Sequence, residues 1–182
     1  MTVDQWSGQV AIVTGGASGI GAAVAEEIRA GGGHVVVFDQ QAGDATIAVD
    51  VANRESVNAA VQQVLAEHGR VDMLVNAAGV GRLGNIITLD PADWDLVMRV
   101  NLDGTFNTCR AVAPIMVAAG RGAIVNIGST FGLVPRDDSL PYAVSKAAVV
   151  HLTKQMAVDL TNSGVRVNCV CPGIVETPMT QV

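Results

Sequence analysis

Short apolar segments alternate with long helical stretches along the chain, and this alternation constrains the fold more than any other feature. The apolar segments are rich in β-branched residues and are apolar on both faces, which is typical of strands in a parallel sheet covered on both sides. We expect strands at 10–13, 34–38, 45–49, 71–75, 122–127 and 165–170, and helices at about 19–30, 54–68, 91–118 and 142–163. This order predicts a doubly wound parallel α/β sheet of the Rossmann type.

Two local patterns refine this prediction. The third helix has the residues typical of a helix start: Asp90 at the N-cap, Pro91 at the first position and Asp93 in the first turn. Only six residues, 39 to 44, separate the second and third strands, and this is too short for the helix that a parallel crossover normally contains. We therefore expect a bare loop there, with one face of the sheet thinly covered near that edge.

Length and charge exclude several classes of protein. A domain typically has about 150 residues, so a chain of 182 residues is expected to form one domain. The net charge of −6 and the lack of a Lys/Arg cluster argue against a nucleic-acid binder and a basic membrane-surface helix. The N-terminus holds no apolar core of a secretory signal, and no apolar run approaches the roughly 18 residues of a membrane span. Three cysteines fit neither a disulfide framework nor a zinc site, so we expect a cytoplasmic protein without a metal.

A glycine-rich segment, Thr14 to Gly21, stands between the first expected strand and the first expected helix. Gly15, Gly19 and Gly21 would permit a tight turn, close approach of the backbone to a phosphate and close packing of helix on sheet. The helix N-terminus would then offer free N–H groups to a pyrophosphate. The spacing is a variant of the usual dinucleotide fingerprint, and alone it also fits an ordinary strand-to-helix turn. The flanking strand and helix favour dinucleotide binding.

Asp39 ends the second expected strand, 20 residues after Gly19. A carboxylate there is placed to accept hydrogen bonds from the adenosine ribose hydroxyls and would repel a 2′-phosphate. No Arg or Lys stands in the glycine loop or just after Asp39 to bind such a phosphate. The sequence therefore favours NAD over NADP, the alternative being a solvated aspartate at a strand end.

Tyr142 and Lys146 stand four residues apart in the last expected helix, so their side chains share a face. An ammonium beside the phenol would lower the pKa of Tyr142 from about 10 toward neutrality and make it a usable acid or base. A Tyr–Lys pair at this spacing is commonplace on helix surfaces. Two observations favour a functional pair: Tyr142 is the only tyrosine in the chain, and Ser129 follows the preceding strand.

With these features the chain resembles the short-chain dehydrogenase/reductase superfamily, in its compact single-domain branch, over residues 8–180. Thr14 to Gly21 is similar to the family's cofactor loop, and Asn76-Ala-Ala-Gly79 to the motif after its fourth strand. Further matches in the family's order are the adenine-contacting pair Asp50-Val51, the catalytic positions Asn101, Ser129, Tyr142 and Lys146, and Pro172-Gly173 at the start of the nicotinamide-side motif.

The resemblance implies hydride transfer between C4 of a nicotinamide and the carbon of a secondary alcohol or ketone. Tyr142 would exchange a proton with the substrate, and Ser129 would hold the substrate oxygen. Lys146 would lower the pKa of Tyr142 and bind the nicotinamide ribose, while Asn101 would position a water that relays protons. The cofactor-binding residues that it implies are Gly15, Ser18, Gly19, Ile20, Gly21, Asp39, Asp50, Val51, Asn76, Ala77, Gly79, Tyr142, Lys146, Pro172, Gly173, Val175 and Thr177.

Other functions fit parts of the pattern. One is a non-catalytic NAD-binding sensor, or an inactive truncated chain, on the same fold. Another is a sugar-nucleotide epimerase or dehydratase of the family's longer branch, which has a differently spaced glycine loop and a larger C-terminal region. The intact Asn-Ser-Tyr-Lys set favours an NAD-dependent dehydrogenase that acts on a small alcohol or ketone.

The last two expected helices carry apolar residues on more than one face. Phe106, Val112 and Val117 in the third helix, with Val144 and Val158 in the fourth, are part of this excess. A helix with one face on a sheet should be polar on the other, so we expect these helices to pack against a second copy in a homodimer or homotetramer.

Relatives of this family continue past the nicotinamide-side motif through a mobile substrate lid, another helix and a seventh strand. Here we expect residues 1–182 to be a single dinucleotide-binding and catalytic domain without them, as a fragment of a longer protein or as a natively truncated chain. The apolar edge that the sixth strand would expose favours the fragment. We expect the cofactor site to be retained and the substrate side to be open to water.

Overall fold

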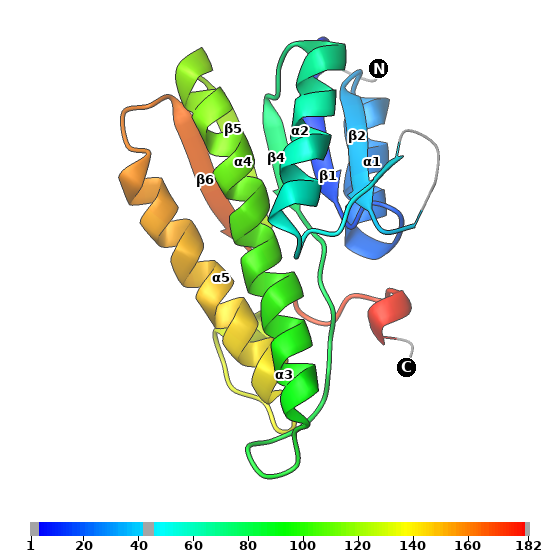
Figure 1. Cartoon of the computed structure of the whole chain (residues 1–182), viewed down its shortest axis with the longest axis vertical. Helices are drawn as coiled ribbons and strands as arrows, with labels where there is room; N and C mark the ends of the chain where they lie inside the picture. Colours follow the sequence, from blue (N-terminus) through cyan, green and yellow to red (C-terminus); the bar gives the residue numbers. More distant parts are fainter. Residues whose placement is uncertain (1–3, 42–45, 181–182) are drawn as a thin grey trace.

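The computed structural model describes residues 4–41 and 46–180, which form a six-stranded parallel sheet with helices packed on it (Figure 1). The strand order is β3-β2-β1-β4-β5-β6, as in the two halves of a doubly wound sheet. The predicted fold class is confirmed. The strands are β1 (Val10–Thr14), β2 (His34–Asp39), β3 (Thr46–Ala48), β4 (Met73–Asn76), β5 (Gly122–Ile127) and β6 (Val165–Val170).

Helices α2, α4 and α5 pack on one face of this sheet and α1 packs on the other (Figure 1). Because parallel strands point alternate side chains to opposite faces, each strand feeds both layers: Ile12 packs toward α2 and α4, and Val13 toward α1. The main helices are α1 (Gly19–Ala30), α2 (Arg54–His68), α3 (Pro91–Val97), α4 (Gly104–Ala119) and α5 (Leu140–Asp159). Short turns are the π-helical η1 (Met98–Asp103) and the 3₁₀ turns η2 (Thr130–Gly132) and η3 (Pro178–Thr180).

The chain changes direction across the sheet between β1 and β4, which are neighbours although β2 and β3 lie between them in sequence. In doubly wound sheets this switch point leaves a crevice at the carboxyl ends of the strands. The glycine loop follows β1 and Ala77-Ala78-Gly79 follows β4, so both segments line that crevice.

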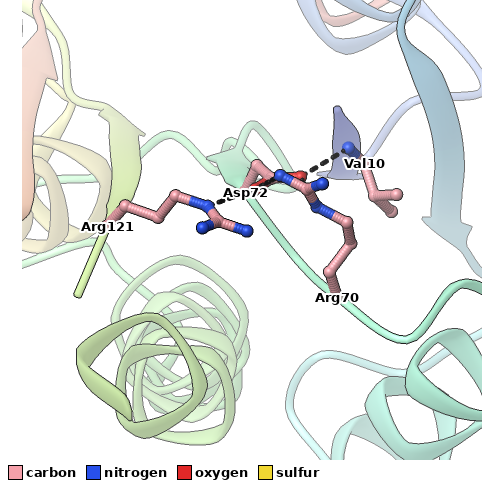
Figure 2. A network of polar contacts seen from close by, with 4 residues as sticks. All are labelled: Val10, Arg70, Asp72 and Arg121. Atoms are coloured by element: carbon pink, nitrogen blue, oxygen red, sulfur yellow. Dashed lines mark hydrogen bonds and ion pairs between the residues drawn. The ribbon is translucent and has the colours of Figure 1, made fainter. Parts of the chain in front are cut away.

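A charged cluster ties the opposite, amino-terminal ends of the strands together (Figure 2). One carboxylate oxygen of Asp72 accepts hydrogen bonds from the Val10 N–H at 2.9 Å and from Arg70 Nε at 2.7 Å. The other oxygen accepts from Arg70 Nη2 at 2.6 Å and from Arg121 at 3.5 Å. Burial opposes the charge, but these donors outweigh it and lower the pKa of Asp72.

Three expected elements differ from the structure by more than a single terminal residue. The stretch 91–118 is interrupted by η1, where the side chain of Asn101 bonds to a neighbouring segment. Helix α5 starts at Leu140 and ends at Asp159, short of 163, because the following turn takes positive φ at Asn162 (68°) and Gly164 (80°). Strand β4 begins at Met73, two residues later than expected.

The N-cap expected before the third helix is confirmed, since Asp90 Oδ1 accepts from the Ala92 N–H at 2.8 Å. The expected loop at 39–44 and the start of the third strand at Ala45 lie partly outside the described residues. Gln40 and Gln41, which are described, are not helical. In the described ranges, 4–41 and 46–180, we find no helix with the length and apolar character needed to cross a membrane.

Candidate active site

The glycine loop after β1 is packed too tightly for side chains. Gly15 has φ +64°, and a Cβ there would lie 2.7 Å from the backbone of Ala78. Gly19 has φ +54°, and a Cβ on Gly21 would overlap the carbonyl of Gly15. The loop therefore lies directly against the segment after β4 and brings the start of α1 to the crevice, as the sequence predicted.

Backbone donors gather where the loop enters α1. Ser18 is the N-cap of this helix, and its side chain makes no capping hydrogen bond. The N–H groups of a first helical turn have no partner within the helix, and they carry partial positive charge. Together with the missing side chains of the loop, they fit the pyrophosphate of a dinucleotide.

Asp39 lies at the other wall of this crevice, next to the glycine loop. Its Oδ2 accepts from the Ala17 N–H and its Oδ1 from the Gln41 N–H, each at 3.1 Å. The carboxylate is thus held at the carboxyl end of β2, beside the place where the loop turns. Gln40 and Gln41 follow it on the wall, so no cation lies in this stretch of the lining.

The three expected reactive side chains lie together, with Ser129 at the start of η2 and with Tyr142 and Lys146 on α5. Ser129 is the N-cap of η2, where its Oγ accepts from the Phe131 N–H at 3.1 Å, and its hydroxyl is near enough to the phenol of Tyr142 to act on the pKa of that phenol. The ring of Phe131 meets the Tyr142 ring edge-on, with centroids 6.0 Å apart. Lys146 Nζ lies 5.7 Å from the centroid of the Tyr142 ring.

Lys146 is buried, with 5% of its surface exposed, and its ammonium donates to the carbonyl of Ile127 at 2.7 Å. Burial lowers the pKa of Lys146 to about 8, although the nearby Cys169 and Cys171 act in the opposite direction. Tyr142 and Lys146 both line the crevice.

The expected lowering of the Tyr142 pKa was wrong for the protein as described. Burial raises the pKa of Tyr142 above 10, and the neighbouring Ser129 hydroxyl offsets only part of this rise. The ammonium of Lys146 lies over the ring of Tyr142 and donates its hydrogen bond to the Ile127 carbonyl. Its charge is not among the causes that change the pKa of Tyr142.

Asn101 lies within η1 and is completely buried. Its amide exchanges two hydrogen bonds with the backbone of Val80, at 2.8 and 3.0 Å, and donates to Ser145 Oγ at 3.0 Å. Ser145 in turn donates to the carbonyl of Tyr142 at 2.8 Å. Asn101 therefore links the segment after β4 to the helical turn that carries Tyr142 and Lys146.

Gly79 shows how closely these groups approach one another. A Cβ on Gly79 would lie 3.2 Å from Asn101 Oδ1 and 3.6 Å from Lys146 Nζ. A side chain at this position would be tight against Asn101 and in ordinary contact with Lys146, so the crevice wall beside these two groups is backbone.

Most of the expected cofactor residues line one crevice of about 420 Å³. Five of the expected residues do not line it: Asp50, Asn76, Pro172, Gly173 and Val175. Those that do are Gly15, Ser18, Gly19, Ile20, Gly21, Asp39, Val51, Ala77, Gly79, Tyr142, Lys146 and Thr177.

Two of the residues away from the crevice have other partners. Asp50 Oδ1 accepts from the Ala52 N–H at 2.9 Å before α2. Asn76 is buried in the sheet, where it donates to Asn126 Oδ1 at 2.8 Å and accepts from Thr108 at 2.6 Å. Asn126 then donates to Thr153 of α5 at 2.9 Å, so this polar chain joins α4 to α5 through β4 and β5.

The sequence reasoning missed Ser145, the carbonyl of Ile127, and the apolar wall formed by Leu96, Val100 and Met179. Ser145 stands three residues after Tyr142, a spacing that places both on one side of the helix and could have indicated it. Backbone carbonyls leave no signal in a sequence, and the apolar wall comes from segments far apart in the chain.

Comparison with known proteins gives consistent matches. A family model described as short chain dehydrogenase matches residues 9–182. The chain is 42% identical to 2-(R)-hydroxypropyl-CoM dehydrogenase of Xanthobacter autotrophicus, over 95% of this chain and 77% of that protein. It is also 42% identical to D-threitol dehydrogenase of Mycolicibacterium smegmatis, over 94% and 72%. The ligand-free aldohexose dehydrogenase of Thermoplasma acidophilum superposes with a TM-score of 0.91 at 33% identity, over 97% of this chain and 70% of that one.

Proposed function

The chain belongs to the short-chain dehydrogenase/reductase family, whose members are oxidoreductases that use a nicotinamide cofactor, and on this premise we propose that it transfers hydride between NAD(H) and a secondary alcohol or ketone. The observation that carries the proposal is the placement of Ser129 and Tyr142 next to each other beside the buried ammonium of Lys146, with Tyr142 and Lys146 at the wall of a crevice that also holds the glycine loop.

NAD, when bound, would accept the hydride that leaves an alcohol carbon, and NADH would return it to a ketone. The phenolate form of Tyr142 takes the proton from the substrate hydroxyl during oxidation, and the phenol form gives one back during reduction. Ser129 donates a hydrogen bond to the substrate oxygen and fixes it within reach of the phenol. These two side chains already lie next to each other, so a substrate oxygen would meet groups that are in place.

The remaining residues hold the cofactor and support this pair. Lys146 presents its ammonium to the nicotinamide ribose, and the first turn of α1 presents its N–H groups to the pyrophosphate. Asn101 keeps the Tyr142 turn against the segment after β4 through Ser145. A relay of protons from Tyr142 through Lys146 and a water near Asn101 is part of the proposal.

We propose NAD as the cofactor because of Asp39. Its carboxylate is held beside the glycine loop and would receive the ribose hydroxyls of NAD, whereas the 2′-phosphate of NADP would meet its negative charge. Small hydroxylated substrates are supported by relatives named as dehydrogenases of threitol and 2-hydroxypropyl-CoM.

The test is absorbance at 340 nm with NAD and a panel of secondary alcohols, and with NADH and the matching ketones. Wild-type chain should turn over at least one pair, and Tyr142→Phe should abolish turnover while it keeps NAD binding. Tight NAD binding without turnover on any substrate would favour a sensor or an inactive chain instead.

We propose in addition that the protein is a homodimer or homotetramer through α4 and α5. Phe106 and Val117 on α4 and Val144 and Val158 on α5 are exposed, although the same helices bury their other faces in the core. A second copy of this chain would cover these side chains across a two-fold axis.

A further inference from the structure

Two of the three cysteines lie side by side at the end of β6. Cys169 is within β6, Cys171 follows the strand, and their sulfur atoms are 3.9 Å apart. Both side chains are partly exposed, whereas Cys109 is buried against Asn76 and Asn126. The proposed mechanism uses neither Cys169 nor Cys171.

This pair lies next to the groups of the candidate active site. A Cβ on Gly128, the residue before Ser129, would lie 2.8 Å from Cys169 Sγ and 2.9 Å from Cys171 Sγ. The two sulfurs therefore flank the backbone that leads into Ser129. Both cysteines are near enough to Lys146 to raise the pKa of its ammonium, against the effect of burial.

A backbone contact connects the pair to the Ser129 segment from the other side. The carbonyl of Pro172, the residue after Cys171, accepts a hydrogen bond of 2.9 Å from the Thr130 N–H. The last residue pair of the β5–β6 ladder is Ile127 with Val170, so Cys171 is outside the ladder. A shift of Cys171 would therefore also shift the adjoining Pro172. A displacement of Cys171 would thus move the backbone of η2, where Ser129 is the N-cap.

We propose that Cys169 and Cys171 are a redox-active dithiol which a peroxide converts to an intrachain disulfide, and that this modification lowers turnover by displacing the Ser129 segment. One thiol is oxidised by peroxide to a sulfenic acid, with release of water. The second sulfur attacks the first, the S–S bond forms, and the sulfenic oxygen leaves as a second water. The two sulfurs lose two electrons, and the O–O bond receives them. The effect on turnover rests on the proposed function, whereas the thiol chemistry does not.

The strand geometry allows such a disulfide to form. Alternate residues of an extended strand point to the same face with Cα atoms roughly 6.6 Å apart. Disulfides span Cα separations of about 4.4–6.8 Å, so this spacing allows closure, which draws the two sulfurs together from 3.9 Å to about 2.0 Å. Burial, followed by the neighbouring Cys171, raises the pKa of Cys169, so Cys169 rests as a thiol and the reaction requires excess peroxide.

Mass spectrometry tests the chemistry without reference to activity. Wild-type chain is treated with excess hydrogen peroxide, alkylated and digested with trypsin, which leaves Cys169 and Cys171 together in peptide 167–182 and Cys109 in peptide 100–110. Peptide 167–182 should lose about 2 Da, resist alkylation, and recover with dithiothreitol. Cys109, whose pKa burial raises to about 12, should oxidise about tenfold more slowly. Gain of oxygen on single cysteines without the loss of 2 Da, or a disulfide between two chains, would overturn the proposal.

Turnover provides the second arm, with Cys171→Ser and Cys169→Ser compared to Cys109→Ala. The first two variants should keep wild-type turnover and lose the inactivation that dithiothreitol reverses, and Cys109→Ala should remain sensitive. A wild-type chain that carries the 2 Da loss at full turnover would refute the link to Ser129. If the untreated chain shows no turnover, the proposed function fails. The mass of peptide 167–182 still shows whether Cys169 and Cys171 form a disulfide.

Discussion

Lys146 donates a hydrogen bond of 2.7 Å to the main-chain carbonyl of Ile127, the last residue of β5. The bond ties α5 to the strand that leads into Ser129, so the helix that carries Tyr142 and the strand end that carries Ser129 keep a fixed spacing. The same bond explains how an ammonium is tolerated at a site with almost no exposure.

Lys146→Met should separate the chemical role of this ammonium from its structural role. The change keeps the bulk of the side chain and removes the charge, so kcat should fall about 100-fold or more. The melting temperature should stay level or rise, because a charge that is costly to bury is gone. Lys154→Met, on an exposed position of the same helix, is the control. Steady-state kinetics and thermal unfolding decide this, and a Lys146→Met variant with wild-type kcat would contradict it.

Alcohol oxidation should accelerate as pH rises. Burial raises the pKa of Tyr142 above its ordinary value of 10, so the phenolate that accepts the proton stays scarce near neutrality. We expect kcat/KM for oxidation to climb from about pH 8 to about pH 10 without a plateau. Ser129→Ala should push the rise to higher pH, because the Ser129 hydroxyl lowers this pKa. A plateau below pH 8 in wild type would show that the phenol titrates lower than its burial implies.

NAD(H) should bind much more tightly than NADP(H), and Asp39→Ala should narrow the gap. The variant removes the charge that faces a 2′-phosphate, and it also frees the Ala17 N–H, so NAD affinity should fall while NADP affinity rises. Titration by intrinsic fluorescence measures both, with Glu26→Ala on the exposed side of α1 as the control. Similar affinities of the wild type for both cofactors would rule this out.

Asp72→Asn should destabilise the fold by about 2 kcal/mol, the worth of its charged hydrogen bonds, without changing kcat per folded molecule. The folded pKa of Asp72 is lowered, so its contribution is present above the ordinary value of 3.8 and is lost as pH falls through the lower folded value. The stability gap between wild type and variant should therefore close below about pH 4. Urea unfolding at several pH values measures it, with the exposed Asp159→Asn as the control. A gap that persists in acid would mean that packing, not charge, is responsible.

Light scattering at micromolar concentration should give the mass of two or four chains. Val144→Glu, which places a charge on the exposed side of α5, should reduce the mass toward one chain. Leu83→Glu, at an exposed apolar residue outside α4 and α5, should leave it unchanged. A wild-type monomer would remove the basis for this assembly.

Local pattern was enough to predict the sheet and the crevice, because β-branched runs, glycines and the Tyr142–Lys146 spacing all act over a few residues. What failed depends on contacts between distant segments. The π-turn at Asn101 exists through its bonds to Val80, 21 positions away, and no periodicity reports them. The pKa of Tyr142 is set by burial, which a helix face alone does not determine. Asp50 matches a family motif, yet its side chain caps the turn before α2.

The amide pair inside the sheet fixes more than two side chains. Asn76 and Asn126 are direct partners in the β4–β5 register, and both are buried. If β4 slipped by one position, each amide would face an aliphatic neighbour and turn to the opposite side of the sheet, with its donors and acceptors unmatched. Apolar strands alone would tolerate several alignments with little penalty. The two amides therefore fix the register of β4 against β5. With the register fixed, the loops that follow these strands have a single placement relative to each other.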